Sequence, residues 1–439
     1  HIVVGGGTAG CILAAKLSED QGRSVLLLEA GPEYPDFEQL PEMLKNGWGL
    51  INLQARAANS PFNWSFTGKA TPQQPNPMPV PRGKVLGGSS AINGQTFIRG
   101  APEDFDTWSS WGNDEWSYIK VLPYFRQIEN DEDFRDDFHG TNGPVPVRRH
   151  KREDWPPLQG AFYRACVSAG YPYNPDNHDP DATGVSLRAE NNVDGVRMSM
   201  ALTHIEPNRN RLNLTIKANV QVMRMVFSGN QATGLEVESG GERFLVEGDQ
   251  ITLCAGAVGS PQLLMLSGIG PRDQLAPLDI PVVVDAPGVG QNMRDHPNVQ
   301  VKLKVKDEVS QDDIARRAVR LRYTATGSKD RNDMQILPSA FSSPIGAPDP
   351  YEQEGVRFTC VLELANGFGE LTLTSNDPTV QPHLNYRYLE DAWDRERLRE
   401  AVRLAMDLVE HPMYNDIIDR RLQPNEADIE SDDSLDAYM

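Results

Sequence analysis

Three glycines near the start of the chain have the spacing that binds the phosphates of a dinucleotide. Gly5, Gly7 and Gly10 form the pattern G-x-G-x-x-G directly after the apolar residues 2–4. Such glycines make a tight turn, let the backbone approach a pyrophosphate and let the following helix pack on the strand. Glu29 ends a second apolar run, where an acid can bind a ribose hydroxyl. The segment therefore predicts a dinucleotide site and leaves open whether the ligand is NAD or FAD.

Two further glycine-rich segments have compositions that suit a ligand better than a core. Residues 83–97 contain adjacent glycines followed by two serines, so the backbone can lie against a ligand while hydroxyl groups form hydrogen bonds. Residues 256–270 follow an apolar strand, and Ser260 with Pro261 predicts the first turn of a helix. The glycines of residues 267–270 predict the end of that helix. Either segment alone could be an ordinary turn.

The elements that must position these segments alternate along the chain. Residues 1–31 read as a strand, a helix and a second strand. Alternating polar and apolar residues predict strands over 211–256 and again over 299–389, as in sheets with one face in water. An apolar stripe predicts a helix over 394–410. Residues 128–155 are rich in charges and turn residues, and we expect a solvated surface there.

Composition excludes several classes of protein. The 439 residues carry a formal charge of −20 at pH 7, which argues against a nucleic-acid binder and against a protein held on membranes by a basic face. No apolar run reaches the roughly 20 residues that span a bilayer, and no signal peptide is visible, so we expect a cytoplasmic protein. The four cysteines are scattered and are expected to be free thiols. The length predicts two or three domains.

Together the three glycine-rich segments resemble the glucose–methanol–choline (GMC) family of FAD-dependent oxidoreductases. Residues 83–106 fit the first signature of that family and residues 256–270 fit the second, with a further likeness at residues 292–296. Ile98 and the two residues after it continue the first signature as in bacterial choline-dehydrogenase-like alcohol oxidoreductases. The resemblance implies an α/β fold with a Rossmann-like, parallel-sheet FAD domain. It also implies a substrate domain whose antiparallel sheet is backed by helices.

The resemblance further implies domain boundaries and FAD contacts. The expected FAD-binding domain covers residues 1–150 and 195–300, and the expected substrate-binding domain covers 151–194 and 301–439. Ile92 takes the position at which some relatives attach FAD through a histidine, so we expect non-covalent FAD. The residues expected to contact FAD are Gly5, Gly7, Thr8, Ala9, Gly10, Glu29, Val85, Gly88, Ser89, Asn93, Thr96, Val222, Ala255 and Gly256.

The reaction that the resemblance implies is oxidation of an alcohol to an aldehyde or ketone by hydride transfer to the flavin N5 atom. Relatives use a C-terminal histidine as general base, and we expect this base beyond Met439, with no catalytic residue and no metal ligand within the chain. His296 is expected to be structural, and His139 and His178 lie in polar turns. A pocket for the substrate is expected within residues 335–365.

The expected partners are a small alcohol and an electron acceptor, either oxygen or a quinone-like carrier. Two alternatives stay open, because one scaffold can support several reactions. One is a lyase or photodecarboxylase built on the same fold, and the other is a truncated flavoprotein without catalytic activity.

Overall fold

The chain forms two compact units, each built from three separate segments. In the computed structural model, the described residues are 1–48, 51–309, 318–339 and 355–439. The first unit consists of His1–Gly94, Val196–Arg294 and Phe368–Tyr388. The second unit consists of Gln95–Gly195, Asp295–Gly367 and Leu389–Met439. Residues 95–150, expected in the FAD domain, thus cluster with the second unit, and residues 340–354 of the expected substrate pocket lie outside the described ranges.

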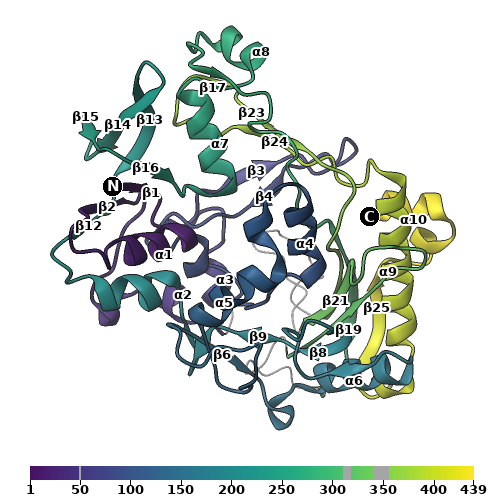
Figure 1. The fold of residues 1–439 in the computed structure, drawn as a ribbon. Coiled ribbons are helices and arrows are strands. Elements are labelled where there is room, and N and C mark those ends of the chain that lie inside the picture. Colours follow the sequence, from purple (N-terminus) through teal and green to yellow (C-terminus); the bar gives the residue numbers. More distant parts are fainter. Residues whose placement is uncertain (49–50, 310–317, 340–354) are drawn as a thin grey trace. The chain divides into compact units, whose positions relative to one another are not determined.

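A four-stranded parallel sheet is the centre of the first unit. Its strand order is β12-β2-β1-β16, with bounds β1 Ile2–Val4, β2 Val25–Leu28, β12 Leu214–Lys217 and β16 Ile251–Leu253. Helix α1, Thr8–Leu17, packs beside β1 and β2 (Figure 1). The central strands β1 and β2 are fully apolar because both faces of a parallel sheet are covered. The predicted strand–helix–strand unit is confirmed.

Smaller elements complete the first unit. An antiparallel sheet contains β13 Gln221–Ser228, β14 Gln231–Ser239 and β15 Glu242–Glu247. Two antiparallel pairs are β3 Phe66–Gly68 with β4 Met78–Val80, and β23 Glu370–Thr372 with β24 His383–Asn385. The remaining strands are β11 Val196–Arg197, β17 Ile269–Gly270 and β18 Val284–Asp285. The remaining helices include α2 Glu42–Lys45, α3 Ile51–Gln54, the 3-10 helix η2 Gly88–Ala91, the π-helix η5 Ala201–Ile205, α7 Gly256–Leu266 and α8 Arg272–Leu275.

A seven-stranded sheet is the centre of the second unit. Its order is β25-β19-β22-β21-β20-β8-β7, and every pair is antiparallel except β7 with β8. The strands are β7 Tyr173–Asn174, β8 Gly184–Leu187, β19 Asn298–Val305, β20 Val319–Tyr323, β21 Met334–Ser339, β22 Gly355–Leu362 and β25 Ile418–Gln423. The predicted antiparallel sheet is therefore confirmed.

Helices cover this sheet and close its core. They are α6 Pro157–Ser168, α9 Ala392–Val409 and α10 Asp432–Tyr438. Leu398, Val402 and Ala405 of α9 are fully buried in the core that these helices form with the sheet. Figure 1 shows α9 running beside the sheet strands of its own unit. The predicted amphipathic helix is confirmed.

Charged side chains are buried within the second unit. Arg397 of α9 is 1% exposed and donates from Nη1 to Asp333 at 2.9 Å and from Nη2 to Asp394 at 2.6 Å. Asp394 also accepts the backbone N–H groups of Asn366 and Gly367, so its carboxylate is satisfied on both oxygens. This ion-pair network connects α9 to Asp333, the residue directly before strand β21 of the sheet.

The solvated surface expected for residues 128–155 is only partly present, because exposed charges at 132–137 and 151–154 flank a buried part of the segment. This segment contains β5 Glu129–Asp131 and β6 Val145–Arg149, and a third strand, β9 Ala189–Glu190, pairs with β6. Glu129 and Asp131 are 0% and 1% exposed. Their charges are buried because two arginines, Arg99 from outside the segment and Arg149 at its far end, neutralise them. A run of charged residues predicts a solvated surface only when the folded chain does not bring oppositely charged side chains against it.

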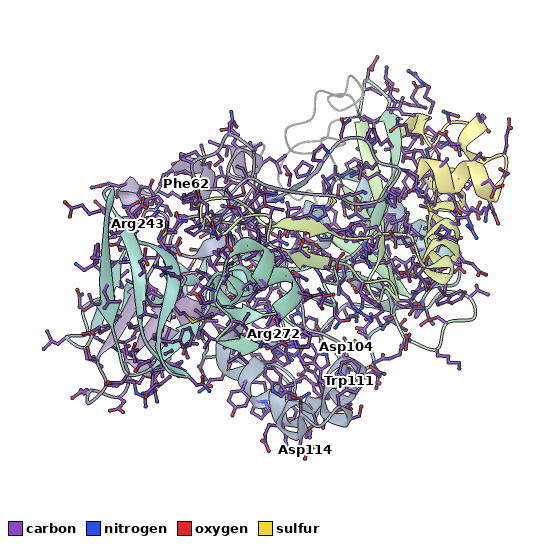
Figure 2. The ribbon with its side chains drawn as sticks, turned by 90° about the horizontal axis from the view of Figure 1, so that it is seen from above. Phe62, Asp104, Trp111, Asp114, Arg243 and Arg272 are labelled. Atoms are coloured by element: carbon purple, nitrogen blue, oxygen red, sulfur yellow. The ribbon has the colours of Figure 1, made fainter. Side chains whose placement is uncertain are left out.

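The surface around α4, Pro102–Ser110, and α5, Tyr118–Ile128, is unusually rich in exposed aromatic residues. Trp111, the residue directly after α4, is 72% exposed and Asp114 is also exposed; both are labelled in the lower part of Figure 2. Across the described ranges, no helix combines the length and the apolar character that crossing a bilayer demands.

All four cysteines are free, as expected.

Candidate functional site

The first glycine turn is shaped by close packing on one side and by open space on the other. Gly5 has φ +97°, and a Cβ added to Gly10 would lie 1.9 Å from the carbonyl oxygen of Gly5. A side chain at either position would therefore strain or separate β1 and α1. A Cβ at Gly7 would instead meet no atom closer than 3.9 Å. Gly7 precedes the first turn of α1, whose free N–H groups can bind an anion.

The second glycine segment lies directly against the first. Gly87 and Gly88 have φ +97° and +52°, and a Cβ at Gly88 would be 2.6 Å from the Cα atom of Gly7. Both backbones can approach because neither residue has a side chain. The segment then forms η2, so its serines follow the contact point within one helical turn.

A buried arginine holds this second segment in place. Arg197 is 0% exposed and donates to the carbonyl oxygens of Leu44 and Ala91. Burial lowers the pKa of Arg197 to about 9. Ser90 accepts a hydrogen bond from the backbone N–H of Met200 at 3.0 Å, which adds a second connection.

The third segment places a helix terminus at the same location. Helix α7 begins at Gly256, so the predicted start near Ser260 and Pro261 is wrong, and Pro261 lies inside the helix. Gly256 has φ +82° and would carry a Cβ into open space. The predicted end is confirmed, because Ser267 caps the helix and Gly268 has φ +85°.

These three segments surround one cavity of about 780 Å³ within the first unit. Ten residues of the predicted FAD site line it: Gly5, Gly7, Thr8, Ala9, Glu29, Gly88, Ser89, Val222, Ala255 and Gly256. Gly10 and Val85 do not line it, because Gly10 packs against Gly5 and Val85 is buried in a small core. Asn93 follows η2 in the first unit, whereas Thr96 belongs to the second unit.

Glu29 is the buried carboxylate of the cavity wall. Its Oε2 accepts the N–H of Gly6 and its Oε1 accepts the N–H of Gly31, both at 2.8 Å. Burial raises the pKa of Glu29 to about 7, although these two hydrogen bonds and the positive charge of Lys84 act in the opposite direction. The carboxyl group can therefore change its protonation state near neutral pH.

Several cavity residues carry no signal that the sequence analysis used. Trp64 and Phe66 stack with ring centroids 5.8 Å apart, and the Nζ atom of Lys84 lies 4.5 Å from the centre of a Trp64 ring. Arg82 also lines the cavity, so its lining includes two cations, Arg82 and Lys84. An anionic ligand with an aromatic portion fits these side chains. In the sequence, Trp64 and Phe66 stand out only as aromatic residues within a largely polar segment.

Histidines do not contribute to this cavity. Among the residues that the structure describes, none of the eight histidines lines it. His296 belongs to the second unit, where its Nδ1 is 3.1 Å from Glu363 Oε2. His204 is buried in η5, and burial lowers its pKa. The cavity can thus bind and orient a ligand, but the described residues around it provide no imidazole base.

Comparisons with known proteins give matches to the same family, and some of these matches cover the whole chain. Residues 1–298 and 366–439 match the two family models described as GMC oxidoreductase. An uncharacterized GMC-type oxidoreductase of Rhodococcus erythropolis is 36% identical over 421 residues, covering 95% of this chain and 81% of the relative. An oxygen-dependent choline dehydrogenase of Burkholderia thailandensis is 34% identical, covering 100% and 81%. The crystal structure of pyridoxine 4-oxidase from Mesorbium loti has a TM-score of 0.89 at 28% identity, covering 100% and 85%.

Proposed function

Because the chain belongs to the GMC oxidoreductase family of FAD-dependent enzymes, we propose that it oxidises the CH–OH group of a small alcohol to an aldehyde or ketone, with FAD in the cavity of the first unit. The observation that carries this proposal is the convergence of three glycine segments on that cavity. When bound, FAD supplies the acceptor for the hydride.

Several residues of the cavity have properties that support FAD as its ligand. Gly7 and Gly256 have open space where a Cβ would stand, so a pyrophosphate can approach the backbone there. The N-terminus of α1 would bind the phosphates, and Lys84 and Arg82 would balance their charge. Glu29 would accept hydrogen bonds from the ribose, and the backbone of Val222 would meet the adenine.

FAD binds without a covalent link in this proposal. Ile92, at the position where some relatives carry the linking histidine, is 2% exposed and packs in a core with Val85 and Ala91. An aliphatic side chain has no nucleophile for the flavin. Denaturation in acid or urea should therefore release all of the FAD into the filtrate, and flavin that stays on the chain would contradict this part of the proposal.

The substrate class rests on the relatives. Those named choline dehydrogenase and pyridoxine 4-oxidase act on compounds with a CH–OH group, and we transfer only this shared chemistry to the chain. The electron acceptor is oxygen or a quinone-like carrier. We assign the general base to none of the residues 1–439.

An anaerobic titration tests the proposal. The absorption spectrum of the FAD-loaded protein is recorded before and after adding choline, pyridoxine, and aliphatic and aromatic primary alcohols. We expect the flavin bands to bleach with at least one alcohol and to return when oxygen or a quinone is added. A protein whose flavin is reduced by dithionite but by none of the alcohols would contradict alcohol oxidation and would favour the lyase or decarboxylase alternative.

A further inference from the structure

Four polar side chains from two separate segments meet inside the second unit. Asp131 ends β5, His139 follows it in a loop, and Asp176 and His178 lie in the loop after β7. All four are at most 6% exposed. The His139 Nε2 atom is 3.4 Å from Asp176 Oδ2 and 3.7 Å from Asp131 Oδ2.

Both histidine rings are oriented by their outer nitrogen atoms. The Nε2 of His178 lies 3.0 Å from the carbonyl oxygen of Phe97, so this nitrogen carries a proton and donates. The Nδ1 of His139 lies 2.8 Å from Asp136 Oδ1, where it donates to the carboxylate. Of the inner nitrogens, His178 Nδ1 has no hydrogen-bond partner among the described residues, and His139 Nε2 faces the carboxylate oxygens of Asp176 and Asp131 at 3.4 and 3.7 Å.

This arrangement is the one that metal-binding histidines use. In metal sites one ring nitrogen donates to a carboxylate or a backbone carbonyl, which fixes the tautomer, and the other nitrogen binds the ion. One ligand atom from each of Asp131, His139 and His178 lies within 4.8 Å of the other two. The ligand atoms of a tetrahedral zinc site stand about 3.3 Å apart, so a small contraction of the side chains would close the site.

The charges around the cluster leave room for a cation. Arg149 donates to both oxygens of Asp131 at 2.9 Å and to Asp176 Oδ1 at 3.1 Å. This single arginine faces three nearby aspartates, because Asp133 also lies 3.5 Å from it, and Asp136 adds a fourth acid on the outer side of His139. The other buried cation nearby, Arg99, is paired with Glu129. The cluster therefore keeps an excess of negative charge.

We propose that Asp131, His139, Asp176 and His178 form a binding site for a divalent transition-metal ion of the zinc type. The donor set of two imidazole nitrogens and two carboxylate oxygens suits that class of ion. The ion would join the β5–β6 loop to the loop after β7, so its role is structural. The proposal does not depend on the reaction or on FAD.

The test counts metal on the full-length, FAD-loaded protein. The protein is stripped with EDTA, titrated with zinc chloride and dialysed, and bound zinc is measured by mass spectrometry. We expect about one zinc per chain, a thermal unfolding midpoint that rises on loading, and an X-ray absorption spectrum with nitrogen ligands at about 2.0–2.1 Å. His178→Gln should lose both the zinc and the rise in the unfolding midpoint.

His150→Gln is the matched control, because His150 is also buried and pairs with the carboxylate of Glu190, outside the cluster. This variant should keep its zinc. A wild-type protein that retains no zinc, equal loss from both variants, or zinc without imidazole ligands would each overturn the proposal. If His178→Gln fails to fold, the ligand set seen by X-ray absorption on the wild-type protein decides the question.

Discussion

The cavity of the first unit and the polar cluster of the second unit differ in what they offer to a ligand. Around the cavity, Gly7 and Gly88 expose backbone because they have no side chains. In the cluster, Asp131, Arg149 and His139 bury full or potential charges and satisfy most of them with each other. The first region recognises a ligand through backbone that is exposed where side chains are absent. The second region is held together by charged side chains that pair with one another. Substitutions should therefore act differently in the two regions. Added side-chain volume should weaken ligand binding in the first region, and removal of a charge should destabilise the second.

The largest effect is expected from added volume at the cavity. Gly7→Val should weaken FAD binding by roughly a thousandfold or more, about 4 kcal/mol, because the valine methyl groups would fill the approach to the pyrophosphate. Flavin absorbance per chain measures this loss. Gly22→Val, in an exposed turn, should keep its flavin. A yellow Gly7→Val protein would show that the glycine turn does not hold the cofactor.

Removal of a buried charge should be the next largest effect. Arg397→Met leaves Asp333 and Asp394 buried without their cation and should lower the free energy of unfolding by about 3–5 kcal/mol. Arg403→Met on the same helix removes an exposed pair with Asp432 and should change little. Urea unfolding of the two variants measures the difference. Equal losses would mean that burial of the pair is not what matters.

The smallest effect is expected from Glu29. This residue lines the cavity of the first unit, but like the residues of the cluster it is a buried ionisable group. Its pKa is about 7 when folded, against an ordinary value of 4.5, so unfolding of the flavin-free protein releases a proton between these values. The free energy of unfolding should therefore fall as the pH rises through this window, by about 3 kcal/mol in total.

Glu29→Gln should remove this pH dependence, and Glu38→Gln, an exposed carboxyl, should retain it. Urea unfolding at about pH 5 and about pH 7.5 measures the slope for the three flavin-free proteins. An unchanged slope in Glu29→Gln would assign the titration to another group.

The difference between the two regions also explains what the sequence could predict. The G-x-G-x-x-G turn, the strand before Glu29 and the glycines near residues 88 and 256 are each patterns of a few consecutive residues, so local spacing indicated the cavity. The aromatic pair Trp64 and Phe66 has no such spacing and was missed.

Long-range pairing explains the remaining errors. The partners of Glu129 and Asp131 include Arg99 and Arg149, which are 30 and 18 positions away in the sequence, and composition alone indicated a solvated run. The start of α7 was placed four residues late, because Pro261 is a typical first-turn residue but here lies inside the helix. Pairing across loops follows from tertiary contacts, which no local pattern contains.

The three-segment construction of each unit has a consequence for synthesis on the ribosome. Strands β1 and β2 emerge early, but their neighbour β16 follows more than two hundred residues later, and Leu371 and Leu384 complete a core of the first unit later still. The nascent chain must therefore carry an unfinished first unit while most of the second is being translated. Early apolar strands remain exposed during that time, so chaperone dependence should be strongest before residue 388 leaves the exit tunnel.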